Sequence, residues 1–247
     1  MELRTAVLSD VGLRRRANED SYSIADELGL YIVADGMGGH TAGQVASQMA
    51  AESAVRALGA LQGAAASLTE KLRYAVAASN REVFSTSQEK PQFAGMGTTF
   101  VALLAGGERI GLAHVGDSRA YLVRGDRIRQ LTDDHSLVAE LVRRKEISEA
   151  AARGHPHRHV LTRAIGVRRS VEPDLLELTP ETGDLFVLCS DGLTGLVTDE
   201  EIDESVRSTE DLDVACQGLV DLANSRGGDD NITVLLVHCT EVERLEG

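Results

Sequence analysis

Four aspartates of this sequence share one setting, in which an apolar run meets a tight, glycine-containing turn. They are Asp35, Asp117, Asp191 and Asp230. A carboxylate at a strand end is held rigidly, and a neighbouring glycine lets a backbone carbonyl approach a cation closely. Any one of these turns alone is more often an ordinary hairpin or Asx turn. The recurrence of all four favours a shared acidic site that binds metal ions.

A further candidate lies near the N-terminus, where Arg14, Arg15 and Arg16 precede Glu19 and Asp20. A guanidinium group binds phosphate through two parallel hydrogen bonds and stays charged beside acidic groups. A solvated charged loop explains the same residues equally well. The role of this segment therefore depends on where the folded chain places it.

Carboxylates that converge repel one another, which raises their pKa values and destabilises the fold unless divalent cations bind between them. Because the candidate ligands are oxygens without an accompanying Cys–His set, Mg²⁺ or Mn²⁺ is the expected ion. Two such ions about 3.5 to 4 Å apart can share a water, lower its pKa and neutralise a phosphoryl group during in-line attack. The predicted chemistry is phosphate-ester hydrolysis without a covalent enzyme intermediate.

Histidines and cysteines offer alternatives that the sequence favours less. The tract from His155 to His159 encloses a proline and is interpreted as an exposed loop. His114 lies in an apolar run and is predicted to be a core side chain with satisfied hydrogen bonds, whereas the position of His135 is left open between core and cleft. A cysteine phosphatase needs an arginine six residues after its thiol, but the residue six positions after Cys239 is leucine.

The elements that would position the site follow from apolar patterning. Short apolar runs predict strands at 5–8, 30–34, 98–104, 110–115, 120–123, 185–188 and 232–237, several of them apolar on both faces. Amphipathic stretches predict one helix pair at 42–61 and 68–87 and another at 200–206 and 212–223. Thr198 and Glu201 have the spacing of a capping box before the third helix. Paired helices between runs of strands indicate a layered α+β fold.

The segment 136–166, termed the flap segment below, is rich in charged residues and carries two short helical patterns, so a small surface subdomain is expected. The 247 residues suit one domain, predicted at 1–240, with a C-terminal tail at 241–247. The formal charge of −14 disfavours nucleic acid as a partner. No apolar run is long enough to span a membrane, and a cytoplasmic monomer with reduced cysteines is expected.

Taken in order, the motifs of this chain resemble the type 2C (PPM) metal-dependent Ser/Thr protein phosphatases in their compact bacterial form. The motifs are Arg15 with Asn18-Glu19-Asp20, Asp35-Gly36-Met37-Gly38-Gly39, Gly116-Asp117-Ser118-Arg119, Ser190-Asp191-Gly192 and Asp230-Asn231. Each is weak alone, but five in the correct order, over about residues 3–237, are specific. The resemblance implies a four-layer αββα sandwich, with two central antiparallel β-sheets flanked by pairs of helices.

The resemblance also implies a metal centre of two Mn²⁺ or Mg²⁺ ions in a cleft at one sheet edge. Asp35 would bridge both ions, with the carbonyl of Gly36 on one of them and Asp191 and Asp230 on the other. Asp117 matches the position at which bacterial members bind a third, weaker ion, although it could instead cap the turn between its two strands. The flap segment matches the mobile flap of those members.

The remaining implied roles surround this centre. Asp20 and Glu19 would bind the ions directly or through water, with Glu19 and Asn231 in supporting positions. Arg15, four residues before Glu19, would hold the substrate phosphate, in preference to its neighbours. The expected reaction is direct attack of a water or hydroxide that bridges the ions on phosphoserine or phosphothreonine.

One departure concerns the leaving-group proton. Some members have histidine in place of Met37 and use it as general acid. His40 is the nearest replacement here, but a structural role at the helix start or proton donation from a metal-bound water explains the pattern equally well. The expected substrates are phosphorylated proteins, in opposition to bacterial Ser/Thr protein kinases. A phosphoprotein-binding module of the same fold without turnover is the alternative.

Overall fold

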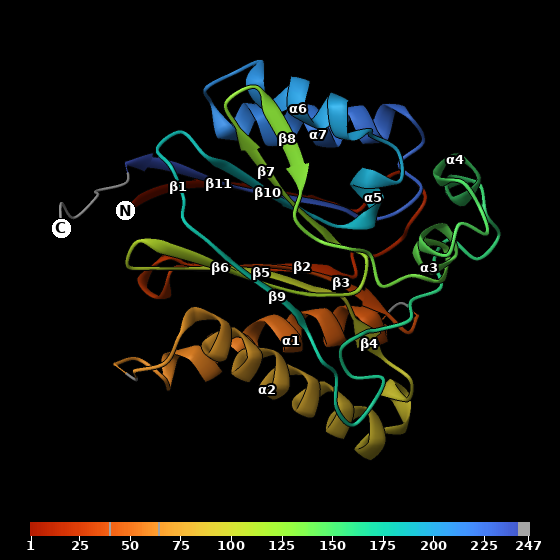
Figure 1. Ribbon diagram of the computed structural model, residues 1–247. Coiled ribbons are helices and arrows are strands. Elements are labelled where there is room, and N and C mark those ends of the chain that lie inside the picture. The colour runs from red at the N-terminus through yellow and green to blue at the C-terminus, as the bar shows by residue number, and fades with distance from the viewer. Residues whose placement is uncertain (40, 64, 242–247) are drawn as a thin grey trace.

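The computed structural model describes residues 1–39, 41–63 and 65–241. His40, proposed above as general acid, lies outside the described residues, and the predicted tail is described only at Glu241. Two antiparallel sheets pack face to face, and a pair of helices covers the outer face of each (Figure 1). The four-layer αββα sandwich is confirmed.

The first sheet has the strand order β1-β11-β10-β7-β8, and the second has the order β2-β3-β5-β6-β9 with β4 paired to β3. The strands are β1 Glu2–Asp10, β2 Asp20–Ala25, β3 Leu30–Met37, β4 Gly97–Thr98, β5 Phe100–Gly106, β6 Arg109–Val115, β7 Arg119–Arg124, β8 Arg127–Gln130, β9 Asp174–Leu178, β10 Leu185–Cys189 and β11 Ile232–Glu241. The helices are α1 Thr41–Gly59, α2 Leu68–Glu89, α3 Leu137–Arg143, α4 Glu149–Arg153, α5 Asp191–Thr194, α6 Asp199–Arg207 and α7 Leu212–Ser225, with short 3₁₀ turns at Asp26–Leu28 and Pro91–Phe93.

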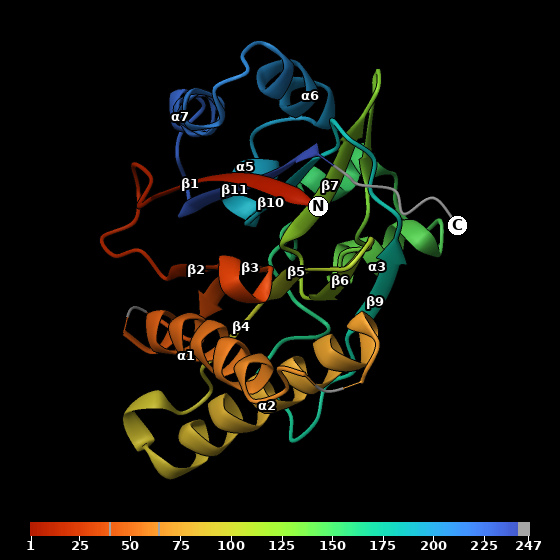
Figure 2. The same ribbon diagram turned by 90° about the vertical axis from the view of Figure 1, so that its left-hand side faces the viewer.

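Strands that are apolar at every position are buried between two layers, because successive side chains of a strand point to opposite faces. On β3, Tyr31 and Val33 pack between the sheets, whereas Leu30 and Ile32 pack against α1 and α2. On β10 the same alternation sends Phe186 to the core between the sheets. Figure 2 shows the helix pairs on opposite sides of the two sheets. The unbroken apolar runs thus supply three core layers.

The helices begin where local capping chemistry permits. Ser67 and Glu70 form a reciprocal capping box at the start of α2, and Thr198 and Glu201 form the predicted one at the start of α6. The buried face of α1 consists largely of alanine and serine, which lets the helix lie close to β3. Among the described residues, no helix is long and apolar enough to cross a membrane.

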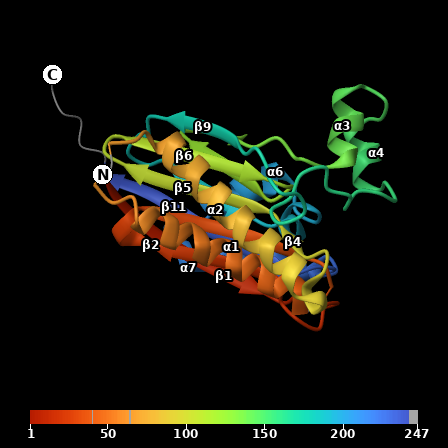
Figure 3. The same ribbon diagram turned by 90° about the horizontal axis from the view of Figure 1, so that it is seen from below.

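The sequence patterns missed three strands, β2, β8 and β9, and each of them is the edge of a sheet. Edge strands are half-exposed and carry polar residues, so their sequences lack the apolar signal of the central strands. The predicted strand 98–104 is also divided, because β4 ends at Thr98 and β5 begins at Phe100. The two predicted short helices of the flap segment are α3 and α4. They project at the end of the sandwich that lies away from the described chain ends (Figure 3).

Candidate active site

Five carboxylates from separate parts of the chain meet at the end of the sandwich that carries the flap segment. Asp20 on β2 pairs in register with Asp35 on β3, so both side chains point to the same face. Burial raises the pKa of Asp35 well above its ordinary value, and the charges of Asp20, Asp191, Asp117 and Asp230 raise it further. These five residues are termed the carboxylate cluster below, and the convergence expected from the sequence is present.

Asp20 is the most deeply held member of the cluster, with 7% of its surface exposed. Its Oδ2 accepts hydrogen bonds from the hydroxyls of Ser190 and Thr233, each at 2.7 Å. Its Oδ1 is buried and has no hydrogen-bond partner among the described residues. Burial raises its pKa to about 7, which the two hydroxyls oppose. A buried acceptor oxygen without a donor is suited to a cation, so the donor set fits divalent metal.

The Asp35 turn is fixed through its backbone. Its N–H donates to Thr99 Oγ1 at 2.8 Å, and its carbonyl accepts from the Thr98 hydroxyl and the Thr99 N–H, also at 2.8 Å. The next residue, Gly36, donates its N–H to the carbonyl of Glu19 at 3.1 Å. These bonds set the direction of the carboxylate at the end of β3.

Two glycines allow Glu19 to approach the cluster. A Cβ on Gly36 would overlap the carbonyl oxygen of Gly43, and a Cβ on Gly43 would overlap Oε2 of Glu19. The Glu19 carboxylate therefore lies over the first turn of α1, in a space that only glycine leaves open. The supporting role expected for Glu19 stays a prediction.

The N-terminal loop, residues 11–19, is tied to the loop before β11 by the buried amide of Asn231. Nδ2 of Asn231 donates to the carbonyls of Val11 and Ala17 at 2.9 and 3.0 Å, while Oδ1 accepts from the N–H of Glu19 at 2.8 Å. Gly228 accepts the N–H of Leu13 at 2.8 Å. Asn231 thus places the arginine-bearing loop beside Asp230.

Arg15 is the arginine that reaches the cluster. Its Nη2 donates to Asp230 Oδ2 at 2.6 Å, whereas Arg14 lies 3.8 Å from Asp229, with both side chains mostly exposed. Burial lowers the pKa of Arg15, but Asp230, Glu19 and Asp35 raise it by more, so the net value lies above the ordinary one. A half-exposed, permanently charged guanidinium at the rim of the cluster can meet an incoming phosphate.

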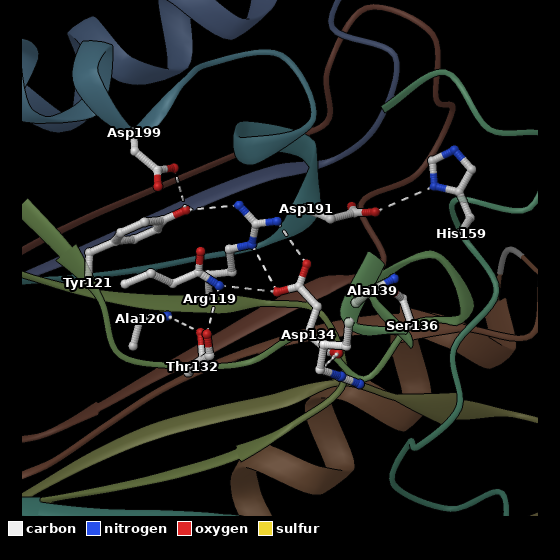
Figure 4. Close-up of polar contacts among 12 residues, drawn as sticks. Arg119, Ala120, Tyr121, Thr132, Asp134, Ser136, Ala139, His159, Asp191 and Asp199 are labelled. Carbon is white, nitrogen blue, oxygen red and sulfur yellow. Dashed lines mark hydrogen bonds and ion pairs between the residues drawn. The ribbon is translucent and has the colours of Figure 1, made fainter. Parts of the chain in front are cut away.

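The outer side of the cluster is formed by Asp117, Arg119 and the flap segment. Burial raises the pKa of Asp117, as do the charges of Asp191 and Asp134. Arg119 binds Asp134 with two hydrogen bonds of 2.9 and 2.8 Å and donates to Tyr121 (Figure 4).

His159 of the flap segment points at Asp191 in Figure 4, with Nδ1 3.5 Å from Oδ2. The histidine tract is exposed as predicted except at His155, which is half-buried. Its last member, His159, borders the site, which the sequence did not indicate.

A second group of metal-type side chains lies behind the Asp117 turn. The ligand atoms of His114, His135 and Asp174 lie within 4.8 Å of one another. Nδ1 of His135 accepts the N–H of Gly116 at 3.1 Å, and burial lowers the pKa of His135, so the neutral ring carries its proton on Nε2 and donates it to Asp174 at 3.0 Å. Those bonds occupy both nitrogens and make His135 a support for the Gly116–Asp117 turn.

His114 is buried as predicted, but the expectation of satisfied hydrogen bonds was wrong. Neither of its ring nitrogens makes a hydrogen bond of good geometry within the described chain. Its ring instead packs against that of His135 at a tilt of 36°, with centroids 4.6 Å apart. Burial lowers the pKa of His114 to about 3, so the ring stays neutral. Sequence reasoning gave no role to the hydroxyls of Ser190, Thr233 and Thr99. Ser190 was part of a motif, whereas the only signal of Thr233 and Thr99 is a polar residue beside or within an apolar strand.

Comparison with known proteins agrees with this geometry. Residues 5–232 match the family model "Protein phosphatase 2C". The serine/threonine phosphatase stp of Listeria innocua is 43% identical over 238 residues, covering 93% of each chain. The crystal structure of the Mycobacterium tuberculosis serine/threonine phosphatase PstP/Ppp is similar with a TM-score of 0.88 at 39% identity, covering 97% of this chain and 99% of that one. A structure of the PstP catalytic domain in complex with two manganese ions matches with a TM-score of 0.86 at 38% identity, with the same coverage.

The chain therefore belongs to the protein phosphatase 2C family. Within that family it is a bacterial-type protein serine/threonine phosphatase.

Proposed function

We propose that the carboxylate cluster is a two-metal centre at which phosphoserine and phosphothreonine of proteins are hydrolysed by direct attack of water. The observation that carries this proposal is the buried, unpartnered Oδ1 of Asp20 among carboxylates that raise one another's pKa values. Such a cluster is costly without cations and favourable with them. The oxygen-only donor set favours Mn²⁺ or Mg²⁺.

The proposed metal ligands come from different elements of the fold. Asp35, at the end of β3, would bridge two ions, with the Gly36 carbonyl beside it. Asp191, at the start of α5, and Asp230, in the loop before β11, would bind from the side of the other sheet. Asp20 and Glu19 would bind from the β2 side, directly or through water. Asp117, on the outer side of the cluster, would hold a third and weaker ion. Bound ions of this kind lower the pKa of water and neutralise phosphoryl charge.

Arg15 and Asn231 position the substrate phosphate in this proposal. Arg15 would hold the phosphate, and its hydrogen bond to Asp230 keeps the guanidinium over the cluster until substrate arrives. Asn231 fixes the loop that carries Arg15. Proton donation to the leaving group stays assigned to His40 as a prediction, in competition with water. Substrates are proposed to be phosphorylated proteins, including a Ser/Thr protein kinase, and the protein is proposed to act as a cytoplasmic monomer.

The proposal is tested by hydrolysis of para-nitrophenyl phosphate and of a phosphothreonine peptide with Mn²⁺, with and without chelator. Asp35→Asn should abolish turnover of both substrates, and Arg15→Ala should raise KM. Asp126→Asn, which changes a side chain that is 95% exposed, is the matched control and should leave both rates unchanged. Peptide binding without turnover in the unmodified protein would favour the binding-module alternative.

A further inference from the structure

A mostly apolar cleft of about 230 Å³ lies at the end of β3, where Met37 lines it. Its walls include Met37, Ala164, Val167 and Val171 together with Arg163 and Arg168. Pockets that hold whole small molecules usually begin at about 300 Å³, so this cleft suits a single side chain. The cleft is unused by the phosphatase chemistry described above.

Met37 connects this cleft to the proposed metal centre. It follows Asp35 by two residues on β3, so the two side chains leave the strand on the same face. Cε of Met37 and Cγ2 of Val167 each lie 2.8 Å from the position of a Cβ on Gly97, so both side chains close over that glycine. Asp35 and Met37 are two strand residues apart, which is about 7 Å, and a bound peptide in extended conformation covers the same distance with about two of its own residues. A substrate whose phosphate lies at Asp35 can therefore place a nearby side chain in the cleft.

The wall of the cleft that carries Val167 is held in place by a buried side chain. Asn80 of α2, which is 2% exposed, accepts the N–H of Gly166 at 2.8 Å and donates to the carbonyls of Arg168 and Arg169 at 3.0 and 3.2 Å. The carbonyl of Ile165 accepts the N–H of Thr98 at 3.1 Å. The loop that carries Val167 is thus tied to α2 and β4, and the cleft is present before any ligand binds.

The surface around the cleft combines exposed apolar groups with positive charge. Val167 is 50% exposed and Val160, in the flap segment, is 45% exposed, which is unusual for large aliphatic residues. Residues 158–174 contain four arginines against two acidic residues, in a chain whose formal charge is −14. Asp174 is paired with Arg163 at 2.6 Å and Glu172 with Arg73. A locally basic, apolar surface in an acidic protein is complementary to an acidic phosphorylated segment that carries an apolar side chain.

We propose that this cleft receives an aliphatic or aromatic side chain of the phosphoprotein substrate, two or three residues from the phosphorylated residue, and so contributes to substrate selection. The inference rests on the proposed function, because it takes the carboxylate cluster as the phosphate site. The side chain binds in the ground state and in the transition state alike, so its effect falls mainly on KM.

The test uses phosphothreonine peptides of equal charge that carry either leucine or glycine at one position, scanned from one to four residues on each side. The unmodified protein with Mn²⁺ should hydrolyse the leucine peptide with about tenfold higher kcat/KM at a position two or three residues away, as expected for a side chain that enters a hydrophobic pocket. Val167→Glu and the space-filling Val167→Trp should both remove this preference. Both should leave the hydrolysis of para-nitrophenyl phosphate unchanged. Val214→Glu, at an exposed position of α7, is the matched control and should keep the preference.

Three results would overturn the inference. They are equal rates for leucine and glycine peptides at every position, a preference that survives both Val167 variants, and an equal loss of ester and peptide turnover in both variants. Failure of the proposed function gives a different result, since the unmodified protein would then hydrolyse neither the ester nor any peptide.

Discussion

The charge of Asp20 is predicted to destabilise the metal-free protein, and Asp20→Asn removes that charge with little change of shape. The side-chain carbonyl of the asparagine can still accept hydrogen bonds from the hydroxyls of Ser190 and Thr233. Its NH₂ group takes the place of the unpartnered Oδ1. The variant therefore keeps the local packing and removes one carboxylate from the cluster. In chelator, it should be more stable than the unmodified protein.

The magnitude follows from the pKa of Asp20, which burial raises from 3.8 to about 7. At about 1.36 kcal/mol per pKa unit, the ionised carboxylate costs about 4 kcal/mol at alkaline pH. Between pH 3.8 and about pH 7, Asp20 holds its proton more often in the folded state than in the unfolded state. The free energy of unfolding therefore falls as pH rises through this range and levels off above it. Between pH 5 and pH 8 the contribution of Asp20 should change by about 2 to 3 kcal/mol.

The assay is urea unfolding in chelator at pH 5 and pH 8, compared for the unmodified protein, Asp20→Asn and the exposed-site control Asp126→Asn. The stability difference between Asp20→Asn and the unmodified protein should be about 2 to 3 kcal/mol larger at pH 8 than at pH 5. The control should show no such difference between the two pH values. Added Mn²⁺ should reverse the order at pH 8, because the ions neutralise the charge that the variant lacks. A stability difference that is the same at both pH values would refute the account of Asp20.

Two further changes test how the site is supported. Asn231→Ala removes three hydrogen bonds from the N-terminal loop. We therefore expect the free energy of unfolding, measured in urea, to fall by about 2 to 3 kcal/mol and KM to rise. An unchanged KM would mean that the loop keeps its position without this amide. Gly43→Ala places a Cβ against the Glu19 carboxylate and should lower activity about tenfold at limiting Mn²⁺. Gly59→Ala, in the same helix with open space around it, should leave the Mn²⁺ titration unchanged, and equal effects of the two substitutions would contradict the role of this close approach.

The sequence by itself was sufficient for the central architecture. Its strand-end pattern pointed to four members of the carboxylate cluster, whereas Asp20 was assigned to it only through the family resemblance. Strands apolar at every position predicted burial between layers, and the capping box at Thr198 marked the start of α6, because both signals are local. The repeated aspartates at strand ends favoured a shared acidic site. The antiparallel order β3-β5-β6 places the ends of β3 and β6, and so Asp35 and Asp117, at the same edge of the sheet. Arg15 was preferred over its neighbours only through the family resemblance, and the structure places it against Asp230.

The tertiary structure alone decided which groups support and border the cluster. The hydroxyls of Ser190 and Thr233 meet Asp20 across about 170 and 213 residues of sequence, and Asn231 joins loops at opposite ends of the chain. The edge strands β2, β8 and β9 and the approach of His159 to Asp191 were likewise not predicted, because a polar half-exposed strand and a surface histidine have no distinctive local pattern. A sequence motif records which side chain sits at a turn, whereas the partners of that side chain depend on contacts between segments that only the folded chain brings together.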